Sequence, residues 1–106
     1  MATGLANLKI YQMASALEIQ IHQTTQKFPK DERYRSVDQL RRSSSAVSNN
    51  IAEAYNKQSV REKVHILRDI AISEAEETES NILRCAEKDF INADDAAKIA
   101  SAYVEL

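Results

Sequence analysis

The sequence predicts an all-α fold, an antiparallel up-and-down bundle of four helices. Its 106 residues include one glycine and one proline, whereas folds built from strands and tight turns use both residues repeatedly. Apolar residues recur at alternating steps of three and four, the spacing of one face of a helix. We therefore expect four helices and short loops within a single domain spanning residues 1–106.

The first helix is expected from Leu5 to Lys27. Pro29 ends it, because proline lacks a backbone N–H and pushes the preceding residue out of helical geometry. The buried face of this helix is expected to contain Ile10, Ala14, Leu17, Ile21, Thr24 and Phe28.

Ser36 and Gln39 have the spacing of a capping box and predict the start of the second helix. Its small serines lower helix propensity, so this helix must depend on packing against its neighbours. The predicted buried positions are Val37, Leu40, Ser44, Val47, Ile51 and Ala54.

A second capping box, Ser59 with Glu62, predicts a long third helix from Val60 to about Asp89. Asn92 is the expected cap of a fourth helix, from Ala93 to Tyr103. The fourth helix is expected to bury Ala96, Ile99, Ala100 and Tyr103. The third is expected to bury Val64, Leu67, Ala71, Ala75, Thr78, Ile82 and Cys85.

The third helix carries more apolar surface than one partner helix would cover. Ile66, Ile70 and Ile72 broaden its apolar face, and a chain of this length has a small core. We therefore expect the protein to associate with copies of itself.

Charge is distributed unevenly, although the formal net charge is only −2. Residues 27–68 contain ten Lys/Arg and five Asp/Glu. Residues 69–106 contain three Lys/Arg and ten Asp/Glu. The basic segment predicts a phosphate-contacting surface, with Arg33, Arg35, Arg41, Arg42, Lys57, Arg61, Lys63 and Arg68 as its candidate residues. The alternative is that these cations are solvated or pair with glutamates of the third helix.

Polar residues beside the buried face of the second helix predict a structural network. Asn50 and Glu53 lie next to that face, and we expect Glu53 or Glu77 to pair with Arg41 across the bundle, since buried charges need partners. The alternative is a ligand or subunit-recognition site at these residues.

No catalytic, metal or cofactor site is predicted. Cys85 lies on an apolar stripe, where a thiol normally serves packing. Glu62 and His65 have the Glu-x-x-His spacing of di-iron bundles, but the chain lacks the second such motif. No segment resembles a signal peptide or a membrane span, and we expect a cytoplasmic protein.

The middle of the chain resembles a known family of four-helix-bundle proteins. The resemblance rests on Phe28-Pro29, Glu32, Tyr34, Gln39–Arg42, Asn50–Glu53 and Glu77–Ile82. The family is that of the ribosomal RNA intervening-sequence proteins and the accessory variability proteins of diversity-generating retroelements. Ala54, Ser48 and Ser73-Glu74 depart from the family pattern, so the geometry between helices is expected to differ from that of relatives.

The resemblance implies a ring-shaped homo-oligomer, commonly a pentamer, and for part of the family an association with RNA and a reverse transcriptase. We therefore expect a non-catalytic accessory or scaffold protein that acts with nucleic acid, RNA or DNA, or with a ribonucleoprotein. The alternative is a scaffold that binds another protein and no nucleic acid.

Overall fold

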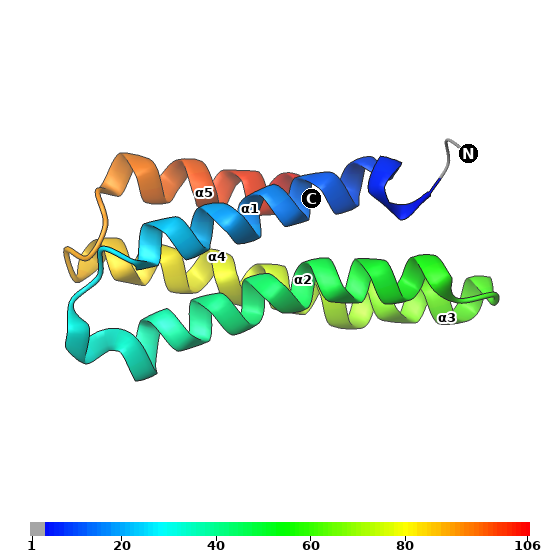
Figure 1. Ribbon diagram of the computed structural model, residues 1–106, viewed down its shortest axis with the longest axis horizontal. Coiled ribbons are helices and arrows are strands. Elements are labelled where there is room, and N and C mark those ends of the chain that lie inside the picture. Colours follow the sequence, from blue (N-terminus) through cyan, green and yellow to red (C-terminus); the bar gives the residue numbers. More distant parts are fainter. Residues whose placement is uncertain (1–3) are drawn as a thin grey trace.

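The computed structural model describes residues 4–106, and within this range it contains helices and no strand. Four long helical rods lie side by side and form an elongated bundle of 43 × 25 × 22 Å (Figure 1). They are α1 (Lys9–Thr25), α2 (Asp38–Asn56), the continuous rod of α3 (Val60–His65), η4 (Ile66–Ala71) and α4 (Ile72–Glu87), and α5 (Ala93–Glu105). Shorter helical turns are η1 (Leu5–Asn7), η2 (Lys30–Glu32) and η3 (Arg33–Val37).

The core lies along the contacts of α2 with α1 and α4 and along the contact of α4 with α5. All six positions predicted to be buried on the second helix are buried, and so are all four predicted on the last helix. The largest side chains with almost no exposure are Ile21, Leu40, Ile82 and Ile99, which come from all four rods. The helical periodicity of the sequence therefore identified most of the core.

Small hydroxyl side chains fill the contact between α2 and α4. Ser43 and Thr78 are fully buried, and their hydroxyl oxygens lie 2.6 Å apart in a hydrogen bond. Ser44, also fully buried, bonds back to the carbonyl of Arg41. The polar core positions of α2 are therefore satisfied internally, as buried polar groups must be.

The long third rod departs from prediction at its N-terminal end. Val64 was expected in the core and is 43% exposed, whereas Ile66 is buried. The rod passes here through η4, a π-helical segment with an extra residue in its turn, which places the buried Ile66 and Ala71 five positions apart. Val64 lines an open groove together with Val47 and Ile51, and water reaches it there.

The predicted cap of the second helix is wrong, although α2 begins only two residues after Ser36, at Asp38. The chain becomes helical directly after Pro29, through η2 and the π-helical η3. Ser36 lies inside η3 and does not cap α2; its hydroxyl donates to Glu32 Oε1 at 2.7 Å. The first helix is also shorter than expected, since α1 ends at Thr25.

The other two predicted caps are confirmed. Ser59 Oγ accepts from the backbone N–H of Glu62, and Asn92 Oδ1 accepts from those of Asp94 and Asp95. Between the last two helices, Asp89 adopts a left-handed conformation with φ 64°. The backbone N–H groups of Asp89 and Phe90 then bond to the carbonyls of Ala86 and Cys85, the Schellman pattern that glycine usually permits.

Among residues 4–106, every helix is too short or too polar to cross a lipid bilayer.

Tyr103 carries a buried polar group that its surroundings do not satisfy. Its side chain is 3% exposed, and its hydroxyl has no hydrogen-bond partner among the described residues. Burial, reinforced by the negative charge of Glu18, raises the pKa of Tyr103 well above its ordinary value. The folded state thus holds the neutral phenol, whereas the unfolded chain releases its proton at the ordinary tyrosine pKa.

Tyr103→Phe should raise the free energy of unfolding by about 1 kcal/mol near neutral pH, because it removes an unsatisfied buried hydroxyl. Above about pH 10 the difference in free energy of unfolding between the variant and wild type should grow. Tyr103 ionises there in the unfolded wild-type chain but not in the folded one, and this favours unfolding of the wild type alone. Urea unfolding at pH 7 and pH 10.5 measures both effects. Thr78→Val is the control, because it breaks a satisfied hydroxyl pair and should destabilise. A Tyr103→Phe variant less stable than wild type would contradict the prediction.

Candidate nucleic-acid interface

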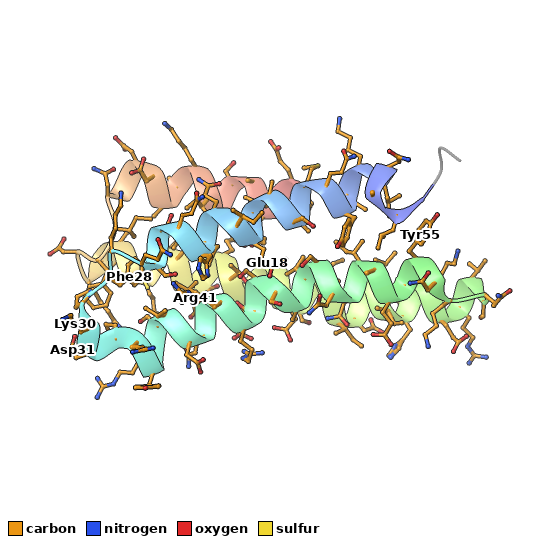
Figure 2. All side chains as sticks on the ribbon, in the orientation of Figure 1. Glu18, Phe28, Lys30, Asp31, Arg41 and Tyr55 are labelled. Carbon is orange, nitrogen blue, oxygen red and sulfur yellow. The ribbon has the colours of Figure 1, made fainter. Side chains whose placement is uncertain are left out.

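The eight predicted phosphate-binding cations do not gather on one surface. Arg33 and Arg35 lie in η3, at the N-terminal end of α2, whereas Lys57, Arg61 and Lys63 lie at or beyond its C-terminal end. The 19 residues of α2 separate the two groups by about 28 Å. Figure 2 shows these opposite ends, with Lys30 and Asp31 labelled at one and Tyr55 at the other.

Arg41 joins two helices of the bundle and takes no part in an exposed cationic surface. Its Nε donates to Thr25 Oγ1 at 2.9 Å, and its Nη2 donates to the carbonyl of His22 at 3.2 Å. Figure 2 shows Arg41 between α1 and α2. The guanidinium therefore caps the last turn of α1, where free carbonyls and the helix dipole favour a cation.

Arg42 faces a different neighbour, because successive residues of a helix point about 100° apart. Its Nη2 lies 2.5 Å from Glu77 Oε2, and its Nη1 lies 3.6 Å from Glu74 Oε1. It therefore joins α2 to α4. This is the alternative predicted for the basic segment, in which an arginine pairs with glutamates of the third rod.

The predicted network of Arg41, Asn50, Glu53 and Glu77 is not present among the described residues. Glu77 pairs with Arg42 in place of Arg41. Glu53 pairs with Lys57 one turn away on the same helix, at 4.0 Å, and Asn50 Nδ2 donates to the carbonyl of Ala46. Glu77 was assigned to Arg41 and not to its neighbour Arg42, because the sequence does not show which helix each arginine faces.

The end of the bundle at the α2–α3 turn is basic. Residues 57–68 contain Lys57, Arg61, Lys63 and Arg68 against a single acidic residue, Glu62. Arg61 and Lys63 have no ion-pair partner within residues 4–106. The pairs of Lys57 with Glu53 and of Arg68 with Asp69 are exposed, and exposed pairs are weak. All four cations therefore remain available to an external anion.

The opposite end is less suited to phosphate. Arg33 and Arg35 are exposed there, and the guanidinium of Arg33 lies 5.8 Å from the centre of the Tyr34 ring, itself 83% exposed. Yet residues 29–38 contain three cationic and three acidic side chains. Since phosphate affinity depends on net positive charge, the α2–α3 end is the stronger candidate.

His65 is hydrogen-bonded to Asp69 at the surface. Its Nδ1 lies 2.9 Å from Asp69 Oδ2, and Arg68 Nε donates to Asp69 Oδ1. These two hydrogen bonds lower the pKa of Asp69, so their contribution to stability is present above the ordinary aspartate pKa and is lost as pH falls below it. No cluster of metal-ligating side chains occurs within the described part of the chain.

Cys85 is a packing residue in the core. It is 2% exposed, and desolvation raises the pKa of its thiol. A reactive cysteine needs the opposite, an accessible thiol with a lowered pKa.

A feature that the sequence did not reveal is an apolar groove of about 570 Å³. The third rod forms one wall from Val64 to Glu79, and the C-terminal end of α5 contributes Tyr103 and Val104. Val47 and Ile51 of α2 also line it. Because its lining comes from different rods, the groove has no local pattern in the sequence.

Comparison with known sequences identifies the family. A sequence model of the 23S rRNA-intervening sequence protein family matches residues 6–106. The chain therefore belongs to this family. No curated protein sequence matches the chain.

Proposed function

We propose that the protein is a non-catalytic, RNA-associated accessory protein and that its α2–α3 end contacts RNA phosphates. The observation that carries this proposal is that Lys57, Arg61, Lys63 and Arg68 outnumber Glu53, Glu62 and Asp69 at that end, with Arg61 and Lys63 lacking an ion-pair partner among residues 4–106. Membership in a family named for an intervening sequence of ribosomal RNA supports RNA over DNA as the ligand.

The geometry suits the phosphate backbone better than a base sequence. Long cationic side chains on a short, exposed helix can reach several phosphates, and such contacts position a protein without reading bases. Tyr55 lies at the same end (Figure 2) and is 37% exposed, so an unpaired base has an aromatic ring near the cations. This combination favours a structured RNA with single-stranded elements.

The proposal extends to assembly. We infer an antiparallel up-and-down bundle that repeats as a ring-like homo-oligomer, with the pentamer as the expected size. The apolar side chains exposed on the third rod, Val60 and Ile72, support association between copies. A head-to-tail contact closes into a ring when its rotation allows. A monomeric mass by light scattering at high micromolar concentration would reject this part.

The remaining elements of the proposal are a cytoplasmic location, no enzymatic activity and no cofactor. A reverse transcriptase is a proposed further partner, from the resemblance to retroelement accessory proteins. The burial and raised pKa of the single cysteine thiol support a non-catalytic role.

A second candidate function is a protein-only scaffold. The apolar groove favours it, because such surfaces bind other proteins more readily than nucleic acid.

RNA binding is tested by fluorescence anisotropy with a labelled hairpin RNA and a duplex DNA of matched length. The wild type should bind the RNA at 50 mM salt and lose about 50-fold in affinity by 200 mM, the loss expected when about four single-stranded phosphates are contacted. Tighter binding of the DNA would reassign the ligand. Absence of salt-dependent binding to both would reject the nucleic-acid function and leave the scaffold.

A further inference from the structure

A pocket lies between α1 and α5, at the end of the bundle opposite the α2–α3 turn. It is lined by side chains from residues 20–27 and 90–99 and has a volume of about 400 Å³. α1 packs against α5, and Figure 1 shows the end of α1 and the start of α5 at the same end of the bundle. Sites for small molecules have volumes of about 300–1,000 Å³. This α1–α5 pocket therefore has room for one small ligand.

Helical spacing directs the polar side chains of the two helices into the α1–α5 pocket. Gln20, Thr24 and Lys27 follow one another at steps of four and three, so they share one side of α1 and its last turn. Asp95 and Lys98 are three residues apart on α5 and face them. The side chains of Gln20 and Thr24 make no hydrogen bond within residues 4–106. Their amide and hydroxyl groups are therefore available to a ligand.

The apolar part of the α1–α5 pocket is held in place by the core. Ile99 is only 2% exposed, and the half-buried Phe90 packs against Phe28, with 5.6 Å between the ring centres. The backbone N–H of Phe90 donates to the carbonyl of Cys85, and the Asn92 side chain caps α5 two residues later. The wall is thus formed before a ligand arrives, which lowers the ordering cost of binding.

The charge of the α1–α5 pocket indicates an anionic ligand. Lys27 and Lys98 reach it from opposite sides, and neither has an ion-pair partner within the described part of the chain. Asp95 is the one acidic residue in the lining. The first free N–H groups of α5 are already bonded to Asn92, so the two lysines must hold the anion. Two ammonium groups match the charge of about −2 on a phosphate monoester at neutral pH.

The remaining groups of the α1–α5 pocket suit a nucleobase. Proteins hold unpaired bases by packing them on aromatic side chains and by hydrogen bonds to their polar edges. Phe90 supplies an aromatic ring here, and Gln20 supplies an amide that can both donate and accept.

We propose that the α1–α5 pocket binds a nucleoside monophosphate. The phosphate lies between Lys27 and Lys98, and the base lies against Phe90 within reach of Gln20. This site is separate from the candidate RNA surface, because Lys57, Arg61, Lys63 and Arg68 are all absent from its lining.

Isothermal titration calorimetry of the full chain tests the proposal with three probes: adenosine 5′-monophosphate (AMP), adenosine and inorganic phosphate. We expect AMP to bind at 50 mM salt. Adenosine and phosphate should each bind at least tenfold more weakly than AMP, because each makes only part of the contacts.

Matched substitutions locate the site. Lys27→Ala with Lys98→Ala should lower the affinity for AMP to that for adenosine. Lys9→Ala with Lys30→Ala is the control, because it makes the same change in net charge at exposed lysines outside the pocket, and its affinity for AMP should equal that of wild type. Asp95→Asn should bind AMP more tightly than wild type, since it removes the one negative charge in the lining. Circular dichroism checks that each variant remains helical.

Three results would overturn the proposal: no binding of AMP, equal effects of the two lysine pairs, or inorganic phosphate binding as tightly as AMP. Loss of AMP binding on Arg61→Glu with Lys63→Glu, but not on Lys27→Ala with Lys98→Ala, would also overturn it by placing the nucleotide on the candidate RNA surface. RNA binding is measured separately by anisotropy, so its presence or absence does not change the meaning of these results.

Discussion

Leu40→Ala is expected to lower the free energy of unfolding by about 2–5 kcal/mol, the range for a buried leucine truncated to alanine. Leu40 has no exposed surface, and it lies on α2, which packs against α1, η4 and α4. Its removal therefore leaves a cavity among several rods that cannot all move inward at once.

Urea unfolding followed by circular dichroism measures this effect. Lys98→Ala is the control, because Lys98 is exposed on α5 and its truncation should change stability by no more than about 0.5 kcal/mol. Equally small effects for the two variants would mean that α2 does not bury the face assigned to it.

The features predicted well from the sequence are those that depend on nearby residues. The buried face of α2 follows from spacing along one helix, and the caps at Ser59 and Asn92 follow from side chains that reach backbone groups two or three residues away. Ser36 failed as a cap although it has the same local pattern as Ser59. The preceding Pro29 already supports a helical turn, so the chain is helical before Ser36 is reached.

The features predicted poorly depend on packing between helices. The π-helical segment Ile66–Ala71 adds one residue to a turn, and Ile66 is buried there in place of the predicted Leu67. Arg41 and Arg42 are adjacent in sequence but face α1 and α4, respectively. The groove is lined by residues from several helices. None of these has a local signature in the chain.

Because Arg41 and Arg42 contact neighbouring helices, the candidate RNA surface should be tested at other residues. Charge reversal of Arg41 or Arg42 would break contacts between helices, and a loss of binding would then be hard to separate from a loss of structure. Arg61 and Lys63 avoid this problem. They lie in the first turns of α3, where acidic side chains are favoured by the helix dipole.

Arg61→Glu with Lys63→Glu should reduce RNA affinity about a hundredfold at 100 mM salt, a loss of about 2.7 kcal/mol in binding free energy. The slope of log affinity against log salt should also become shallower by about 1.4, the value for two single-stranded phosphates no longer contacted. Anisotropy titrations between 50 and 200 mM salt give both quantities, and circular dichroism confirms that the variant remains helical.

Arg33→Glu with Arg35→Glu provides the matched control. It makes the same change of four charge units on exposed arginines, but at the end of the bundle where cationic and acidic residues balance. If the loss of RNA affinity came only from the change in net charge, both double variants would bind equally weakly. If the control alone lost affinity, the interface would lie at η3 beside Tyr34. A large loss confined to the Arg61 and Lys63 variant would place the RNA at the α2–α3 end, because only there do the cations outnumber the acids.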